Sequence, residues 1–543
     1  MQNVGKRYLW RSLCTSGGGQ LFLNPAYADD VTGGDVTYDS GNPLPAGLIA
    51  GGTISPSATD PGNVHHNTLR VDGLNINGRL LYGGYTTGLG NATGNEVILK
   101  NTTGNISSAQ PFIYGGWSAQ GNATGNTITL AGAAGSGANY YLELYGGSGN
   151  GSGKDFTTGN TLQIKGKGNE AYEVKNFEKL KFVLNSDVAS GDTMLRIHGS
   201  MQGFDWTKIS VDGAADWLSS SSGTKRVNLY SESAISLTNY GTSPVNGTSG
   251  NYEYGITTNT TTPAATTVSA TEIYFDRNQF RNADIKYNTV LPPAGGLYNG
   301  AIYGGTSTLG NTTKNNKLTV DGLNINGRNL YGGYTQSIVG DSTGNEVILK
   351  NTTANISAYA PSVYGGWSAQ GNATGNTITL AGAAGGNTNI YLQLYGGGGN
   401  GSGKDFTTGN TLQIKGKGNE ARDVRNFEKL KFVLNEDVAS GDTMFMTNGF
   451  VQNFDWSKIG VEGASTWLSE SSGTKRAYLY DGSPVTLTNY GTSPVNGTSG
   501  NYEYGITTDT ATPNATTVGA SKIYFDRNQF RNADIKYDTV LPP

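Results

Sequence analysis

The chain repeats itself at two scales, and this constrains its fold more than any other feature of the sequence. Residues 251–293 align with residues 501–543, and 36 of these 43 positions are identical. The repeat predicts two tandem modules, residues 45–293 and 294–543, each closed by the same Leu-Pro-Pro triplet. Because the two modules are near-copies, we expect them to share one fold.

A shorter unit recurs inside each module. The tripeptide Tyr-Gly-Gly begins at Tyr82, Tyr114, Tyr145, Tyr303, Tyr331, Tyr364 and Tyr395. Within a module the copies follow one another at steps of 32 and 31 residues, and then of 28, 33 and 31 residues. Most are followed by a polar loop, by Thr-Gly-Asn and by a segment that alternates between apolar and polar residues, as at 93–99 and 124–130. Alternation with a period of two predicts strands, and strands at even spacing predict a stacked solenoid.

The fold class predicted from this pattern is all-β, a parallel β-helix or β-solenoid. A single unit of this length cannot bury its apolar face, but stacking it on its copies at about 4.8 Å does so and pairs the backbone above and below. Asn95, Asn126 and Asn160 would then fall in register as a ladder of side-chain amides. The tyrosines of the repeated tripeptide would form a parallel aromatic column. We expect almost no helix, because even residues 176–185 alternate with a period of two.

Composition excludes several other classes of protein. The chain has 82 glycines in 543 residues and only 14% charged residues, against a typical ~25%. These values exclude a coiled coil, a charged disordered tail and an ordinary helical enzyme. The net charge of −4 gives no basic field for a nucleic acid partner. The single cysteine, Cys14, builds neither a disulfide framework nor a thiolate zinc site, and no apolar run is long enough for a membrane-spanning helix.

Residues 1–28 have features of a signal peptide, and residues 29–44 would form a linker to the first module. Lys6, Arg7 and Arg11 supply a positively charged n-region, and Ala26 and Ala28 give the small-x-small pattern of a signal-peptidase site. The apolar h-region is short and interrupted by polar residues. The alternative is an N-terminus without a targeting role.

Three segments carry a family resemblance: residues 113–132, their counterpart 363–382, and residues 176–195. They resemble the repeat units of autotransporter passenger domains, the secreted part of type V systems in Gram-negative bacteria. The resemblance implies a right-handed parallel β-helix that is extracellular, displayed at the cell surface and associated with the outer membrane. It also implies a translocator barrel as a partner, and this chain does not contain one.

The sequence offers little catalytic chemistry, and we expect no catalytic, cofactor or metal residues. The run at 340–344, Gly-Asp-Ser-Thr-Gly, resembles the elbow of a serine nucleophile, but the first module carries Asn91 and Ala92 at the matching site. No histidine follows His198, so the second module lacks the base of a triad. His65 and His66 are also absent from the second copy, and no set of ligands at usable spacing surrounds them.

The parallel β-helix also hosts polysaccharide lyases and hydrolases, which use clustered carboxylates. Carboxylates shared by the two modules are scattered along the sequence, and the best candidates are Asp205 with Trp206 and the copy Asp455 with Trp456. An acid, a ring that can stack on a sugar and a base, Lys208 or its copy Lys458, stand together there, although a buried tryptophan at a strand end explains the pattern better. A cluster of carboxylates on one face of the solenoid would favour the enzyme.

Loops rich in Ser, Gly, Asn and Thr follow the Tyr-Gly-Gly tripeptides, with Trp117 and Trp367 at the bases of two of them. Such loops on a rigid scaffold are where a surface protein contacts a ligand, so these tryptophans are candidate ligand-contact residues. We therefore expect a non-enzymatic adhesin or structural stalk, whose partner is a host-cell or matrix glycan or protein receptor. The alternatives are a polysaccharide-degrading enzyme and a self-associating subunit of a surface layer or filament.

Overall fold

The fold is known from a computed structural model. It describes residues 31–32, 34–45, 48–54, 62–104, 108, 110–132, 141–219, 224–260, 265–292, 300–336, 339–354, 361–382, 392–469, 473–510, 512 and 515–536. The predicted signal peptide, with Ala26 and Ala28, lies outside the described residues.

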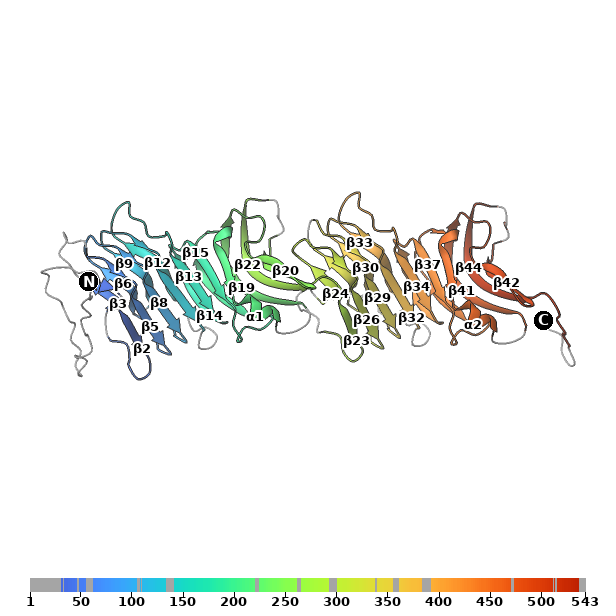
Figure 1. Ribbon diagram of the computed structural model, residues 1–543, viewed down its shortest axis with the longest axis horizontal. Coiled ribbons are helices and arrows are strands. Elements are labelled where there is room, and N and C mark those ends of the chain that lie inside the picture. The colour runs from blue at the N-terminus through green and yellow to red at the C-terminus, as the bar shows by residue number, and fades with distance from the viewer. Residues whose placement is uncertain are drawn as a thin grey trace, which may run out of the picture. The chain divides into compact units, whose positions relative to one another are not determined.

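The chain is an all-β parallel β-solenoid, as the repeat predicts. One face of the first repeat is a seven-stranded parallel sheet in the order β18-β15-β13-β11-β8-β5-β2 (Figure 1). Its strands are β2 (Asp35–Tyr38), β5 (Thr68–Asp72), β8 (Glu96–Lys100), β11 (Thr127–Ala131), β13 (Thr161–Lys165), β15 (Lys179–Val183) and β18 (Ile209–Asp212). Ile128 lies between Val97 and Leu162, so each apolar residue meets its counterpart in the neighbouring coil.

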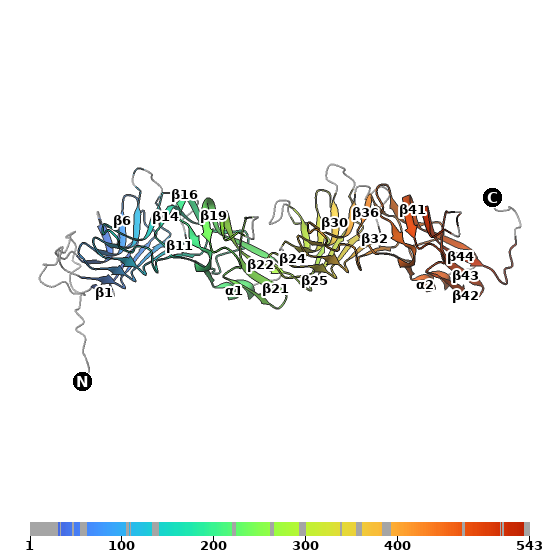
Figure 2. The ribbon, with the colours of Figure 1, turned by 90° about the horizontal axis from the view of Figure 1, so that it is seen from above.

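A second parallel sheet of the first repeat carries the Tyr-Gly-Gly tripeptides. Its strands are β3 (Leu48–Ile54), β6 (Leu80–Thr86), β9 (Phe112–Ser118), β12 (Glu143–Gly149), β14 (Asn169–Lys175) and β16 (Thr193–Met201). The labels of β6, β14 and β16 follow one side of this repeat in Figure 2. A third, short sheet joins β1 (Val31–Thr32), β4 (Val64–His65), β7 (Ala92–Thr93) and β10 (Ala123–Thr124).

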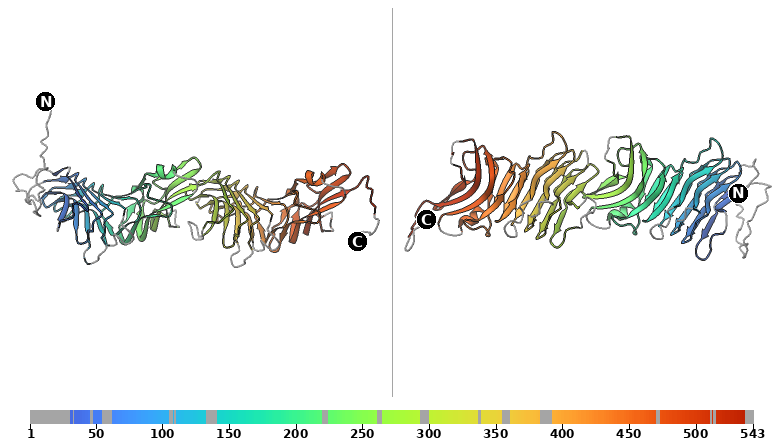
Figure 3. Two further views of the ribbon diagram at one scale, coloured as in Figure 1. Left: turned by 90° about the horizontal axis from the view of Figure 1, so that it is seen from below. Right: turned by 180° about the vertical axis from the view of Figure 1, so that it is seen from behind.

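The second repeat builds the same sheets. Its long sheet consists of β23 (Asp284–Tyr287), β26 (Lys317–Asp321), β29 (Glu346–Lys350), β32 (Thr377–Ala381), β34 (Thr411–Lys415), β37 (Lys429–Val433) and β40 (Ile459–Glu462). The Tyr-Gly-Gly sheet consists of β24 (Ile302–Ser307), β27 (Leu330–Thr335), β30 (Ser362–Ser368), β33 (Gln393–Gly399) and β36 (Asp423–Arg425). The short sheet consists of β25 (Thr313–Lys314), β28 (Ser342–Thr343) and β31 (Ala373–Thr374). In Figure 3 the strands within each repeat follow one another as successive rungs.

Each repeat ends in a group of strands that includes antiparallel pairs, where the Tyr-Gly-Gly pattern stops. In the first repeat these are β19 (Lys225–Thr238), β20 (Asn246–Ser249), β21 (Tyr252–Thr258) and β22 (Thr267–Gln279). In the second they are β41 (Lys475–Thr488), β42 (Asn496–Ser499), β43 (Tyr502–Thr508) and β44 (Thr517–Gln529), next to β38 (Thr443–Thr447), which pairs with β35 (Asn419–Ala421). Two short strands, β17 (Phe204–Asp205) and β39 (Phe454–Asp455), pair with β19 and β41.

Helix is scarce in the part of the chain that the structure describes, as predicted. The α-helices there are α1 (Ala214–Ser219) and α2 (Ala464–Ser469), six residues each. None of the described helices has the length and hydrophobicity needed to cross a membrane.

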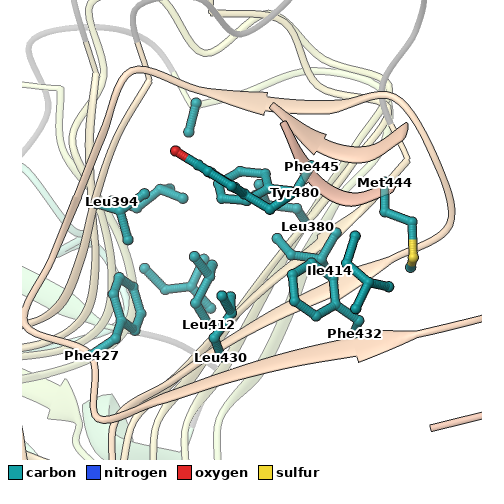
Figure 4. Close-up of a cluster of buried hydrophobic side chains, with 14 of the residues drawn as sticks. Leu380, Leu394, Leu412, Ile414, Phe427, Leu430, Phe432, Met444, Phe445 and Tyr480 are labelled. Atoms are coloured by element: carbon teal, nitrogen blue, oxygen red, sulfur yellow. The ribbon is translucent and has the colours of Figure 1, made fainter. Parts of the chain in front are cut away.

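The core is a narrow column of aliphatic and aromatic side chains inside each stack. In the second repeat Leu412 and Leu430 lie on neighbouring strands and are at most 3% exposed, and Figure 4 shows them with Leu394 and Phe427 pointing into the interior. In the first repeat Leu180 lies in the alternating segment 176–185 and is fully buried. The period-two interpretation of that segment is therefore confirmed.

The chain divides into two compact units whose limits cut across the end strands of the first repeat. Residues Asn246–Thr257 and everything from Asp276 onward belong to the second unit, together with Ser222–Arg226. The β20–β21 hairpin of the first repeat is thus part of the same unit as the second repeat.

Candidate functional site

The feature that both repeats share most closely is a ladder of buried asparagines. Asn67, Asn95, Asn126 and Asn160 are at most 1% exposed. The Asn126 Oδ1 atom accepts bonds from the backbone N–H and the side-chain amide of Asn95, at 2.9 and 3.1 Å. The Nδ2 atom of Asn126 donates to the carbonyl of Ala92 at 3.0 Å. Each amide therefore satisfies polar groups of two coils, and the predicted asparagine ladder is confirmed.

The glycines of Tyr-Gly-Gly make room for this ladder. A Cβ atom on Gly116 would lie 2.6 Å from the Asn126 Nδ2 atom, and one on Gly115 would lie 2.5 Å from the carbonyl oxygen of Gly146. Both distances are too short for a real methyl group, so the first glycine allows the coils to approach and the second leaves space for the amide. The tripeptide is thus a packing motif.

The tyrosines of the tripeptide form the predicted column of stacked rings. The Tyr114 ring lies 4.9 Å from that of Tyr82 and 5.1 Å from that of Tyr145, with interplanar angles of 9° and 23°. In the second repeat Tyr331 and Tyr364 stack at 5.1 Å and 4°. Burial raises the pKa of the Tyr114 hydroxyl, so it is protonated at neutral pH.

The predicted contact residues Trp117 and Trp367 lie at matching positions on the Tyr-Gly-Gly sheets of the first and second repeats. Trp117 stacks on Tyr85 at 4.7 Å, and Trp367 stacks on Tyr334 at 4.6 Å. Both tryptophans are half-buried. The next residue in this row is Ser148 in the first repeat, so no third ring continues the stack there. The Tyr–Trp pair is thus partly open to solvent.

The other predicted contact residues lie where the solenoid passes into its end strands. Trp206 is 1% exposed, and its Nε1 atom donates to the carbonyl of Thr242 at 3.1 Å. Asp205 caps the following 3-10 turn by accepting from the Thr207 N–H at 2.8 Å and hydroxyl at 2.7 Å. The hydrogen bond from the Thr207 side chain is the main cause of the lowered pKa of Asp205.

The second repeat places Asp455 and Trp456 in the same way. Trp456 is 2% exposed and donates to the carbonyl of Thr492 at 3.1 Å, and Asp455 accepts from Ser457. A ligand cannot stack on either buried indole ring. The binding roles of Asp205 and Asp455 remain predictions.

The structure brings together a carboxylate pair that sequence reasoning missed. Glu143 on β12 lies opposite Glu173 on β14, and the Tyr145 hydroxyl lies 2.9 Å from a Glu143 oxygen and 3.1 Å from a Glu173 oxygen. Lys175 forms an ion pair with Glu173 at 2.8 Å. Because β14 lacks the Tyr-Gly-Gly tripeptide, the sequence does not reveal that these two residues share a register. The 30-residue spacing, close to one coil, is the signal that could have found them.

The pKa values of the two carboxylates are shifted in opposite directions. Burial raises the pKa of Glu143, and the neighbouring charge of Glu173 adds to this effect. Burial acts in the same direction on Glu173, but bonds from Lys175 and Ser200 outweigh it and lower its pKa. Two acids whose pKa values are driven apart are typical of an acid–base pair.

A second polar cluster lies on the neighbouring strands β14, β16 and β19. His198 lies between two carboxylates, with Nδ1 2.7 Å from a Glu232 oxygen and Nε2 3.3 Å from a Glu170 oxygen. Arg196 also contacts Glu232, at 3.0 Å. Glu232 has a positive φ of 94°, a conformation that costs about 1–3 kcal/mol for a residue other than glycine.

Neither polar cluster is repeated in the second module. Gln393 and Asp423 occupy the positions of Glu143 and Glu173, and the Gln393 side-chain amide donates to Asp423 at 3.3 Å. Asn448 and Gly482 stand in place of His198 and Glu232. The asparagine and tyrosine ladders are therefore common to both repeats, whereas the acidic clusters are specific to the first.

The outer face of the first repeat's long sheet also carries a shallow hollow of about 470 Å³. Its lining is entirely polar and includes Gln163, Lys179, Lys181 and Lys208. Lys181 is paired with Asp212 at 2.6 Å and Lys208 with Glu178 at 3.0 Å. The hollow contains none of the predicted contact residues.

No cluster of three or more His, Cys, Asp or Glu side chains suited to a metal ion occurs among the described residues. Comparison with protein-family models, with curated proteins and with solved structures finds no match. The class that the geometry defines is therefore the parallel β-solenoid, with an asparagine ladder and a tyrosine column in each repeat.

Proposed function

We propose that this chain is a structural stalk of the autotransporter passenger kind, displayed outside the cell and without catalytic activity of its own. The observation that carries the proposal is the contrast between the two repeats. Both retain the buried ladder of Asn95, Asn126 and their counterparts Asn345 and Asn376, with the same bonds. Of Glu143, Glu173, His198 and Glu232, only Glu173 has an acidic or basic counterpart in the second repeat, Asp423.

The contrast favours a mechanical role over a catalytic one. Duplication of a stalk adds length to the scaffold, and each copy must keep the residues that hold its coils together. Duplication of an enzyme adds little unless the reactive residues are copied too. The resemblance of residues 113–132 and 363–382 to passenger repeats supports a surface location for such a stalk.

The experiment is protease shaving of intact producing cells, comparing the chain with a variant that lacks residues 294–543. If the chain is a stalk, protease added outside the cells should cleave both proteins. A fluorophore attached to the end distant from the membrane should lie closer to the membrane in the shortened variant. A chain that resists shaving on intact cells but is cleaved in lysates would contradict the surface location. An unchanged fluorophore height would contradict the stalk.

The carboxylate pair Glu143 and Glu173 favours a second candidate function, a polysaccharide hydrolase or lyase. Such enzymes use two carboxylates on one face of the scaffold, one as acid and one as base. Against this role, Tyr145, Lys175 and Ser200 already bond these two acids, and Glu143 is only 8% exposed. Release of reducing ends or unsaturated products from acidic polysaccharides, abolished in Glu173→Gln, would favour the enzyme over the stalk.

A further inference from the structure

One end segment occurs twice in the chain with nearly the same sequence but with different surroundings. Residues 251–293 and 501–543 share 36 of 43 positions, including Tyr-Glu-Tyr-Gly-Ile at the start of β21 and of β43. The first copy is covered by the opening coil of the second repeat. The second copy, near β42 in Figure 1, has no such coil against it among the described residues. The two copies can therefore be compared residue by residue.

Glu253 of the first copy is 0% exposed and accepts bonds from five donors. One donor, the Asn278 side-chain amide at 3.0 Å, belongs to the hairpin region itself. The other four belong to the first coil of the second repeat: the Ser307 hydroxyl, the backbone N–H groups of Thr308 and Leu309, and the Asn311 amide, at 2.6–3.2 Å. A buried carboxylate is tolerated only with such a complete set of donors.

The chain after the hairpin adds a strand to the same coil. Residues 284–287 form β23 and pair in parallel with residues 317–320 of β26. Just before β23, the Phe280 carbonyl accepts from the Asn316 side chain at 3.1 Å, and the Ala283 N–H donates to the Asn316 Oδ1 atom at 3.1 Å. The asparagine ladder of the second repeat therefore begins on residues contributed by the first sequence repeat. Phe280 is 7% exposed and Ala283 is 2% exposed.

In the C-terminal copy the corresponding residues are exposed to solvent. Glu503 is exposed and accepts from the Asn528 side-chain amide at 3.4 Å. Phe530, the counterpart of Phe280, is 43% exposed, and Ile535, the counterpart of Ile285, is 65% exposed. A carboxylate, an amide, a phenyl ring and an aliphatic side chain, whose counterparts all contact a solenoid coil in the first copy, are thus exposed on β43, β44 and residues 530–536.

We propose that this surface is a docking site for the first coil of a third β-solenoid module of the same kind, one that begins like residues 302–321. The incoming coil would supply four donors to Glu503, in the way that Ser307, Thr308, Leu309 and Asn311 bind Glu253. It would also pair a strand with residues 534–536 and cover Phe530. The fold would then extend by module addition, with each module ending in the acceptor for the next.

The start of this chain's own first repeat fits the site less well, which favours a module of the second type over a second copy of the chain. Ile54 stands where the second repeat has Ser307, and it cannot donate to a carboxylate. The side of β5 that the docking strand would pair with is also already occupied. β2 pairs with β5 there, in the way that β23 pairs with β26. A second copy could dock only after β2 had been displaced.

The test uses the full chain and an extended chain in which a further copy of residues 294–543 follows Pro543. Hydrogen exchange followed by mass spectrometry compares the two proteins over residues 501–508 and 528–536. Docking predicts that the amides of residues 533–536 exchange at least ~10-fold more slowly in the extended chain, because they enter a hydrogen-bonded edge. The matched hairpin at residues 251–258 should exchange equally in both proteins.

A pair of variants separates docking from simple folding of the added module. Glu503→Ala should remove the added protection in the extended chain, and it should leave the melting temperature of the original chain unchanged because Glu503 is exposed there. Glu253→Ala should increase exchange at residues 302–314 in either chain. Equal exchange over residues 528–536 in the two proteins would overturn the proposal. Concentration-dependent protection of the same residues in the original chain would overturn it too, because the occupant would then be a second copy. These results are independent of the surface location tested above.

Discussion

The asparagine ladder leads to the most direct prediction about stability, the substitution Asn126→Ala. This change removes the acceptor of the Asn95 backbone N–H and one acceptor of the Asn95 side-chain amide, and it removes a donor to the Ala92 carbonyl. All these groups are buried, and the Asn95 amide keeps one further bond, to the carbonyl of Val64 at 3.0 Å. A buried polar group without a partner costs about 1–3 kcal/mol. One to two such groups lose their partners, so Asn126→Ala should lower the free energy of unfolding by about 1–6 kcal/mol.

The assay is urea unfolding combined with hydrogen exchange over residues 92–99 and 123–131. Exchange localises the effect, which is needed because a chain of two units does not unfold in one step. The control is Asn150→Ala, because Asn150 is exposed in a loop and its loss should change stability by less than about 0.5 kcal/mol. Asn376→Ala should repeat the loss in the second module, since its Oδ1 atom accepts from Asn345 in the same way. A loss below about 0.5 kcal/mol for both ladder variants would refute the reasoning.

Three further predictions concern the sheet that carries the Tyr-Gly-Gly tripeptides. Glu143→Gln should stabilise the first repeat at pH 7, because the raised pKa of Glu143 means that folding disfavours its charge and that stability falls as pH rises through the folded pKa. The gain in stability should disappear below the ordinary glutamate pKa of 4.5, where the carboxyl is protonated in both the folded and unfolded states. Thermal melts from pH 4 to 8 would measure the gain, and a loss of stability at pH 7 would contradict the prediction. The second repeat already carries a glutamine, Gln393, at this position. Tyr114→Ala should cost at least about 1–3 kcal/mol in urea unfolding, because two ring stacks worth about 0.5–1.5 kcal/mol each are lost, and a smaller cost would show that the column is not stabilising. If the stalk is also an adhesin, Trp117→Ala with Trp367→Ala should weaken retention on glycan-coated surfaces without unfolding the chain, and unchanged retention would exclude these rings as contacts.

The strands within one coil were predictable from the sequence, because the same alternating pattern occurs in many coils. The repeat placed the Tyr-Gly-Gly and Thr-Gly-Asn segments on strands, and the register of Tyr82, Tyr114 and Tyr145 follows from their spacing alone. The strands that lack these signals were harder to align. β14 carries no such tripeptide, and the pairing of Glu143 with Glu173 therefore appears only when the chain is folded.

The sequence named candidate contact residues but did not give their accessibility. The sequence offered Trp117 as a ligand contact at the base of a polar loop, and Trp206 beside Asp205 as a sugar-stacking ring of a candidate active site. Trp206 is buried under the passage to the end strands, and Trp117 is half-buried on Tyr85. Accessibility depends on which elements pack over a ring, and a single sequence carries no record of such long-range contacts.

The sequence by itself determined the architecture, because a repeated apolar face with Gly and Asn at fixed positions can be buried only by stacking on its own copies. Only the tertiary structure decided which groups surround each end segment. Glu253 and Glu503 lie in identical pentapeptides, yet one is fully buried by four donors from the next coil and the other is exposed. The physical reason is that the solvation of a carboxylate is set by the groups around it in space, and those groups lie more than 50 residues away in the chain.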